Sequence, residues 1–115
     1  MVYKIIPVAK PRMTRSDKWK QRPCVMKYRA YKDELRLSKV KLPECHHVTF
    51  TLPMPKSWSN KQKSKMVGKP HKVRPDSDNL LKGLWDALLI DDAHIWDARV
   101  TKLWGFDGAI QIEPL

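Results

Sequence analysis

The sequence predicts an α+β fold, with a small mixed sheet and two to three helices in one domain spanning residues 1–115. Three observations predict it. The 115 residues leave room for one modest hydrophobic core. Apolar residues make up 42% of the chain, which is enough for a folded protein and argues against pervasive disorder. Stretches with strand periodicity and stretches with helical periodicity follow one another without an internal repeat or a linker.

The amino-terminal third is predicted to hold a strand, a loop and a helix. Residues 2–8 (VYKIIPV) alternate in hydrophobicity as a strand does. Residues 9–24 carry six basic side chains and show no period, so we expect an exposed loop. A helix is predicted over residues 26–37, because three large apolar side chains recur at spacings of three and four: Tyr28, Tyr31 and Leu35.

A strand and a short basic helix are predicted in the middle of the chain. Residues 46–53 (HHVTFTLP) are rich in β-branched and aromatic side chains, which favours a strand that ends at its proline. Residues 56–70 carry many lysines and predict a short helix. Ser57 can cap this helix, and Gly68 with Pro70 ends it.

The carboxyl-terminal part is predicted to hold one helix and two strands. The helix begins just after Pro75, since a proline disfavours helix at the residue before it. Its buried stripe consists of leucines that share one helical face: Leu80, Leu81, Leu84 and Leu88. Residues 98–106 and 109–115 read as strands, and the Asp-Gly pair at residues 107–108 predicts a hairpin between them.

Cysteine use and hydropathy exclude several protein classes. Cys24 and Cys45 form no C-x-x-C pair, so neither a disulfide framework nor a zinc site is predicted, and both thiols are expected to be half-buried. Residues 45–47 (CHH) lack a partner pair at zinc-finger spacing and are expected to open a strand. No apolar run is long enough to span a bilayer or to form a secretory signal, so we expect a cytoplasmic protein that does not enter the membrane.

Charge is distributed unevenly along the chain. Residues 1–75 carry 20 Lys and Arg against 4 Asp and Glu, whereas residues 76–115 carry 3 against 8. The net charge of +11 is therefore concentrated in the first part, which points to a polyanionic partner such as DNA. Aromatic residues are interleaved with the basic ones, which suits contacts with phosphates and stacked bases: Trp19, Tyr28, Tyr31 and Trp58. The alternative is a solvated basic surface with ordinary core aromatics.

Five aspartates gather between Arg74 and Asp92. Asp76 and Asp78 flank one serine at the predicted start of a helix, and Asp91 with Asp92 follows its end. Carboxylates from separate elements that meet at one point are the ligands that a hard cation such as magnesium prefers. Simpler explanations exist for each acid: a helix cap, an i, i+4 pair of Asp78 with Lys82, or a turn. The remaining acid, Asp86, is expected to be solvated near Lys82.

The same stretch resembles a known family. Residues 74–88 (RPDSDNLLKGLWDAL) followed by Asp-Asp look like the signature of the RusA family of Holliday junction resolvases, a family frequent in prophages. Residues 54–71 and the Lys-Pro-Arg at residues 10–12 are also similar to many members, so the resemblance covers nearly the whole chain. It implies a magnesium-dependent endonuclease that acts as a homodimer and nicks four-way DNA junctions, with manganese as a substitute metal.

The resemblance also implies roles for individual residues. Asp76, Asp78 and Asp92 would be the catalytic, metal-binding acids, and Lys82 the essential lysine. Asp91 would be a further metal ligand, and both Asp91 and Asn79 match motif positions of lower rank. The connection before the Asp-Asp pair is shorter than in many members, which leaves open which of the two acids turns inward; we favour Asp92. DNA is expected to be held by basic residues of the first part of the chain: Lys10, Arg12, Arg15, Lys18, Lys20, Lys69, Lys72 and Arg74.

Paired nicks in a two-fold symmetric junction require two active sites, which a homodimer supplies. Apolar material for its interface is expected among four large aromatics, unless the core takes them all: Trp85, Trp96, Trp104 and Phe106. Two other functions stay open at this point. One is a nuclease for other branched or single-stranded DNA, and the other is a non-catalytic basic DNA-binding module.

Overall fold

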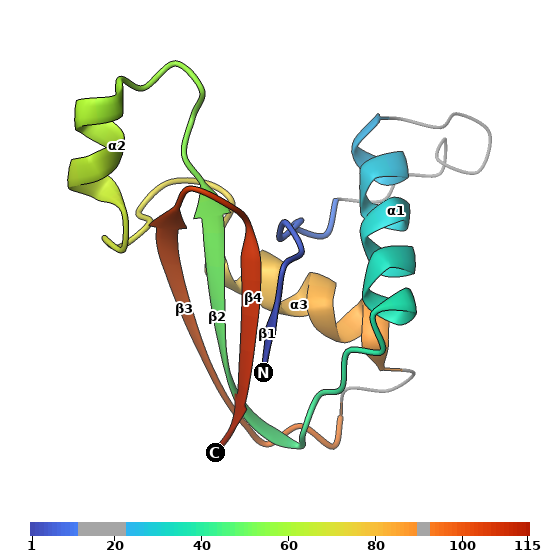
Figure 1. Ribbon diagram of the computed structural model, residues 1–115. Coiled ribbons are helices and arrows are strands. Elements are labelled where there is room, and N and C mark those ends of the chain that lie inside the picture. The colour runs from blue at the N-terminus through green and yellow to red at the C-terminus, as the bar shows by residue number, and fades with distance from the viewer. Residues whose placement is uncertain (12–22, 90–92) are drawn as a thin grey trace.

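The computed structural model describes residues 1–11, 23–89 and 93–115, and these form three helices and four strands (Figure 1). The helices are α1 (Pro23–Leu37), α2 (Asn60–Met66) and α3 (Ser77–Leu88). The strands are β1 (Val2–Tyr3), β2 (Cys45–Pro53), β3 (Asp97–Gly105) and β4 (Ala109–Pro114). The predicted α+β class with a small mixed sheet is therefore confirmed.

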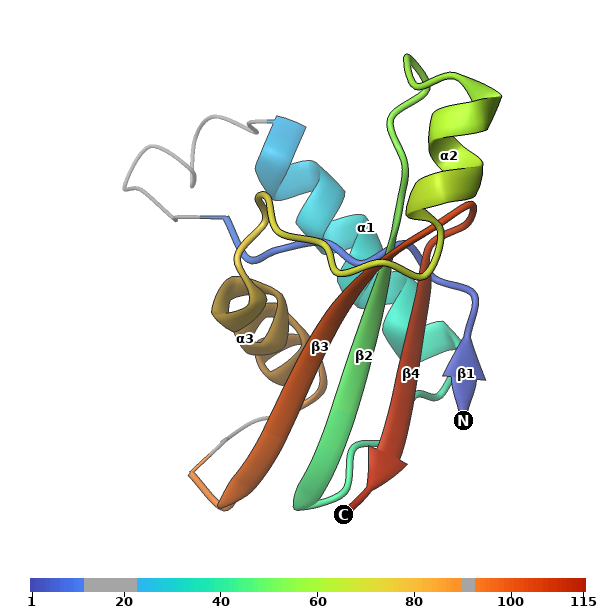
Figure 2. The same cartoon turned by 90° about the vertical axis from the view of Figure 1, so that its left-hand side faces the viewer.

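The strands form one sheet in the order β1-β4-β2-β3, seen face-on in Figure 2. Strand β2 runs through its middle. It pairs in parallel with β3, with Val48 opposite Val100, and antiparallel with β4, with Phe50 opposite Ile110. A parallel pair needs a long crossover, and here the crossover between β2 and β3 contains both α2 and α3.

The predicted hairpin at Asp107–Gly108 is wrong. Strands β3 and β4 follow one another in the chain, but β2 lies between them and pairs with both. The connection must therefore cross the end of β2, and two glycines permit this close approach. A Cβ atom on Gly105 would lie 2.3 Å from Thr51 Cγ2, and one on Gly108 would lie 2.6 Å from Ile6 Cα. The local turn signal was real, but pairing with the buried central strand decides the topology.

One face of the sheet carries the core. Along β2 every second side chain is buried, from His46 through Val48 and Phe50 to Leu52, and the residues between them are half-exposed. Helices α1 and α3 cover the buried face (Figures 1 and 2). They do so with the residues that helical periodicity predicted, including Tyr28, Tyr31 and Leu35 of α1 and Leu80, Leu81 and Leu84 of α3. Leu88, the last leucine of the predicted stripe, is only half-buried.

Several element boundaries differ from the predictions. Strand β1 stops at Tyr3, because the amide of Ile5 bonds the Tyr3 carbonyl (2.9 Å) and turns the chain. Helix α2 is capped by Ser59 rather than Ser57: the Ser59 hydroxyl accepts from the amide of Gln62 (3.2 Å). Gly68 follows the helix at a φ of 78°, a conformation that glycine adopts without strain, as its predicted role as terminator requires.

The Cys-His-His stretch is structural. It opens β2 as predicted, and His46 is fully buried. The indole N–H of Trp85 donates to His46 Nε2 (3.0 Å), so the proton of the neutral ring sits on Nδ1 and is donated to the Pro43 carbonyl (2.7 Å). Both ring nitrogens are thus occupied. Cys45 is half-buried as predicted, whereas Cys24 is exposed, since it lies on the outer face at the start of α1. Among the described helices, none has the length and apolar character needed to cross a membrane.

Helix α3 lies close to α1 and to the amino-terminal segment because of Gly83. A Cβ atom there would lie 3.1 Å from the amide nitrogen of Lys10 and 3.2 Å from the carbonyl oxygen of Val8. The Gly83 carbonyl accepts from the Tyr28 hydroxyl (2.8 Å), and the Lys10 amide donates to the Asn79 carbonyl (3.3 Å). These backbone neighbours are held in place and cannot easily move aside.

We therefore expect Gly83→Ala to lower the free energy of unfolding by about 1–2 kcal/mol, because overpacking outweighs the roughly 1 kcal/mol gain in helix propensity. Urea unfolding measures this change. Ser64→Ala in the exposed face of α2 is the matched control and should stay within about 0.5 kcal/mol of the parent. An unchanged or raised stability of Gly83→Ala would contradict the close packing.

Candidate active site

The segment that leads into α3 is held against the edge strand β3. The Gly68 amide bonds the Trp104 carbonyl (2.8 Å), the Trp104 amide bonds the Lys69 carbonyl (3.0 Å), and the His71 amide bonds the Lys102 carbonyl (3.0 Å). The segment thus follows β3 backwards from its carboxyl end. The path of this segment determines the position of Asp76, the N-cap residue of α3.

Lys102 fixes the last part of this segment. Its ammonium group donates to the carbonyl oxygens of Val73 (2.9 Å) and Pro75 (2.7 Å), on either side of Arg74. Charge-assisted bonds of this kind are stronger than neutral ones. Sequence reasoning missed Lys102 as a positioning residue. The available signal was that it is one of only three basic residues after Pro75.

Asp76 occupies the N-cap position of α3 with φ −69° and ψ 147°. Its carbonyl accepts from the Leu80 amide (3.1 Å), but its side chain makes no capping hydrogen bond within the described part of the chain. The carboxylate is exposed. The simple explanation of Asp76 as a side-chain cap is therefore not realised, and its oxygens face solvent.

Asp78 lies in the first turn of α3 and is also exposed. One of its oxygens, Oδ1, accepts from the Asn79 amide (2.9 Å). An open cavity of about 560 Å³ lies at the helix start and is lined by Arg74, Pro75, Asp76 and Asn79. Arg74, Asp76 and Asn79 thus bring a guanidinium, a carboxylate and an amide side chain to one hollow, and Asp78 is not among the residues that line it.

The third predicted acid belongs to the Asp-Asp pair that follows α3. Asp91 and Asp92 lie outside the described residues, so the choice between them stays a prediction. Within residues 1–11, 23–89 and 93–115, no group of three or more His, Cys, Asp or Glu side chains is arranged to hold a metal ion.

Lys82 pairs with Asp86 on α3, whereas the pair considered from the sequence was Lys82 with Asp78. Lys82 Nζ lies 3.5 Å from Asp86 Oδ1, and Lys10 Nζ also bonds the Asp86 carboxylate. Burial raises the pKa of Asp86, but the hydrogen bond and charge of Lys10 and the charge of Lys82 outweigh it, so the net pKa lies below the ordinary value. Asp86 therefore joins the amino-terminal segment to α3, and is less solvated than the sequence suggested.

The predicted DNA-binding residues fall into three groups. Lys69, Lys72 and Arg74 are exposed on the segment that leads to Asp76. Lys10 is half-buried and bonded to Asp86, which favours a structural role over a phosphate contact. Arg12, Arg15, Lys18 and Lys20 lie outside the described residues. Exposed carboxylates beside an exposed basic segment are the arrangement expected of a protein that acts on a nucleic-acid backbone.

Comparison with known proteins also points to a protein that acts on nucleic acid. The family described as endodeoxyribonuclease RusA matches residues 3–113. The chain therefore belongs to the RusA family of endodeoxyribonucleases. It is also 38% identical over 68 residues to the uncharacterized protein YqaN of Bacillus subtilis (strain 168), an alignment that covers 52% of this chain and 48% of YqaN. The chain thus spans about half the length of that curated relative.

The lowered pKa of Asp86 predicts a pH-dependent contribution to stability. A carboxyl whose pKa is depressed by folding stabilises the protein above its unfolded pKa, and this stabilisation is lost as pH falls through the folded pKa. We expect Asp86→Asn to lower the free energy of unfolding by about 1 kcal/mol at pH 7; the deficit should begin to shrink below about pH 4, the unfolded pKa, and vanish only below the lower folded pKa of Asp86. Chemical unfolding at several pH values measures it. Asp33→Asn on the exposed face of α1 is the control, and a deficit of Asp86→Asn that persists in acid would contradict the ion pairs.

Proposed function

We propose that this chain is a magnesium-dependent endodeoxyribonuclease that resolves Holliday junctions by paired, symmetric nicks. Membership of the RusA family supports the endonuclease activity. The observation that carries the proposal is the exposed carboxylate of Asp76, which makes no capping bond among the described residues and shares a cavity with Arg74 and Asn79. The cation and the branched substrate are inferences beyond family membership.

The residues at the start of α3 fit magnesium. This ion keeps several waters and is commonly held by one or two carboxylates together with substrate phosphates. The exposed carboxylate of Asp76, which lines the cavity, and that of Asp78, two residues further along, would supply that donor set, and we propose that Asp92, with Asp91, completes it. When bound, magnesium lowers the pKa of a water and neutralises charge on the phosphate; manganese can replace it. Asp76 and Asp78 hold the ion, and Arg74 meets the phosphate backbone beside it.

Lys82 is proposed to stabilise the charge that develops on the phosphate. It lies one helical turn after Asp78, and its side chain is about half exposed (49%), so it faces the same solvent region. Its ammonium is 3.5 Å from Asp86, a carboxylate that it shares with Lys10. The lysine at position 10 can satisfy Asp86 while Lys82 turns toward DNA, since long exposed side chains reorient at little cost.

DNA is proposed to lie along the basic segment between α2 and α3. Lys69, Lys72 and Arg74 are exposed in the segment that precedes Asp76, and α2 adds exposed lysines at positions 61 and 65. Every lysine or arginine that meets a phosphate releases condensed cations, so binding to DNA should weaken steeply as salt rises. Contacts with phosphates do not depend on the base sequence, so they suit a protein that recognises the shape of DNA.

The acids are tested by replacing each with asparagine, which keeps the shape and removes a ligand charge. We expect Asp76→Asn, Asp78→Asn and Asp92→Asn to lower the cleavage rate of a four-way junction by at least about 100-fold, while junction affinity is kept or rises. The rate is measured with and without added magnesium. Cleavage without added magnesium would contradict the proposed dependence on this metal. Normal cleavage by Asp92→Asn together with loss in Asp91→Asn would reverse our choice within the pair.

The same assay separates a catalytic from a structural role of Lys82. We expect Lys82→Ala to lower the single-turnover rate by about 100-fold or more with little change in affinity, because a transition-state contact is lost. A purely structural ion pair predicts instead a small loss of stability and normal cleavage. Lys61→Ala on α2 is the matched control, since it removes an exposed lysine at the edge of the basic segment. Junction binding without cutting by the parent protein would favour a non-catalytic DNA-binding module.

Paired nicks predict a homodimer. Of the four aromatics expected to supply an interface, Trp104 is buried and Trp85 half-buried, whereas Trp96 is 73% and Phe106 58% exposed. The exposed two flank β3 at opposite ends, about 30 Å apart at the rise of a strand. We expect sedimentation at micromolar concentration to give about twice the chain mass of 13.5 kDa. Trp96→Ala and Phe106→Ala, made separately, show which end forms the interface. A strict monomer, or nicks in one strand per binding event, would favour a nuclease for other branched DNA.

A further inference from the structure

Lys102 occupies an unusual place in β3. In the parallel pairing it stands opposite Phe50, a fully buried residue, so its side chain leaves the sheet on the face that the helices cover. The other members of this row are apolar, since Ala98 and Val100 pack against the core and Trp104 is buried. A lysine in such a row requires partners for its ammonium group, because burying an unpaired charge is costly.

The partners of the Lys102 ammonium group are backbone carbonyls. Its Nζ atom donates to the carbonyl oxygens of Val73 (2.9 Å) and Pro75 (2.7 Å). The Pro75 carbonyl belongs to the same peptide group as the amide nitrogen of Asp76. The bond therefore fixes the orientation of the peptide group that leads directly into the proposed metal ligand.

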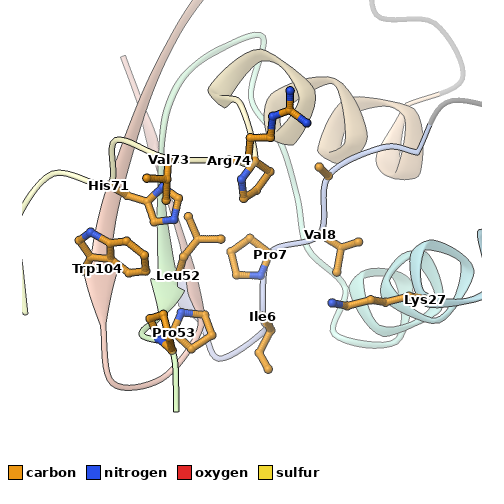
Figure 3. Close-up of a pocket in the computed structure, with 13 residues that line it drawn as sticks. Ile6, Pro7, Val8, Lys27, Leu52, Pro53, His71, Val73, Arg74 and Trp104 are labelled. Atoms are coloured by element: carbon orange, nitrogen blue, oxygen red, sulfur yellow. The ribbon is translucent and has the colours of Figure 1, made fainter. Parts of the chain in front are cut away.

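Backbone pairing between β3 and the segment that leads into α3 ends at His71. Within the described ranges, residues 72–75 take part in no backbone–backbone hydrogen bond. Figure 3 shows Val73 in this part of the chain, beside a mainly apolar pocket of about 520 Å³ that Trp104 also lines. Open space on one side gives little packing support, so the two bonds from Lys102 link this part of the chain to the sheet.

The carboxylate of Asp76 depends on this support. The side chain is exposed and makes no capping hydrogen bond among the described residues. Its place is therefore set by the backbone, which has φ −69° and ψ 147° at this residue. A metal ligand displaced by a fraction of an ångström binds less well, and removal of the groups that orient a ligand typically weakens metal binding by about 10–100-fold.

We propose that Lys102 is a positioning residue of the metal site: through the Pro75 carbonyl it holds Asp76 where its carboxylate binds magnesium. The proposal rests on the proposed nuclease function and adds a residue that lies outside the Asp-x-Asp-Asn motif. Lys102 acts through the backbone rather than on the phosphate, because its ammonium group already donates to two carbonyl oxygens. Removing this group should therefore lower the affinity for metal and leave the affinity for DNA unchanged.

Three variants test this role. Lys102→Met keeps the length of the side chain and removes the donor and the charge, whereas Lys102→Arg keeps both. Arg99→Met is the matched control. Arg99 lies on the same strand, is exposed, and stands opposite His47 on the other face of the sheet. Its replacement changes the net charge by the same amount without touching the segment that leads to Asp76.

Metal binding is measured on DNA-free protein with Mn²⁺, from the electron paramagnetic resonance signal of the free ion. The second readout is the magnesium concentration that gives half-maximal single-turnover cleavage of a four-way junction. We expect Lys102→Met to weaken both by about tenfold, Lys102→Arg to recover most of the loss, and Arg99→Met to match the parent. Excess magnesium should restore the cleavage rate of Lys102→Met, whereas a disrupted fold would stay inactive. Junction affinity in EDTA, from fluorescence anisotropy, should be the same for all.

Folding of each variant is checked by circular dichroism. Should Lys102→Met fail to fold, Lys102→Gln takes its place, since it keeps a donor and removes only the charge, and it is expected to show a smaller loss in the same direction. Where Mn²⁺ binds only together with DNA, the magnesium midpoint alone decides.

The outcomes separate the two proposals. Parent metal affinity in folded Lys102→Met would overturn the positioning role, and so would an equal loss in Arg99→Met, which would point to net charge. Weaker junction binding in EDTA with unchanged metal affinity would make Lys102 a DNA contact and also overturn it. A Mn²⁺ affinity that depends on Lys102, in a parent protein that cuts no junction, supports the positioning role while the nuclease proposal alone fails. If the parent neither binds Mn²⁺ nor cuts, both fail.

Discussion

The parallel pairing of β2 with β3 is the constraint on which the candidate site depends. Because parallel neighbours cannot be joined by a short turn, the chain leaves the end of β2, forms α2 and α3, and returns to start β3 beside the start of β2. On the way, residues 68–71 bond the carboxyl end of β3. The helix that carries the acids therefore begins next to the ends of both strands, with Lys102 of β3 bonded to the two carbonyls that flank Arg74.

Charge is arranged by the fold in two separate ways. At Asp86, opposite charges are paired, since Lys10 and Lys82 both contact one carboxylate and join the amino-terminal segment to α3. At Asp76 and Asp78 the carboxylates stay exposed, with Arg74 sharing the cavity of Asp76. Pairing lowers the pKa of an acid and stabilises the fold, whereas exposed acids at a helix start contribute little to stability. The exposed pair is thus the one that we propose for an external cation and phosphate.

Trp85 and Trp104 each pack against a histidine, at different places in the fold. The indole N–H of Trp85 donates to the buried His46. Near the carboxyl end of β3, the ring of Trp104 packs against the rings of His71 and Trp58. The mainly apolar pocket next to these rings shares Arg74 and Pro75 with the acid cavity.

The sequence by itself determined the local features, because they depend on residues close together in the chain. Helical periodicity identified the buried faces of α1 and α3, alternation identified β2, and the Asp-x-Asp-Asn motif located the helix start and identified the family. Local signals failed where distant segments compete: the Asp-Gly turn predicted a hairpin, but β2 inserted between β3 and β4. Only the tertiary structure decided that Lys102 positions the segment before Asp76 and that His71 joins Trp104 in a pocket wall. No periodicity records these contacts, because they form between segments that meet only when the sheet is assembled.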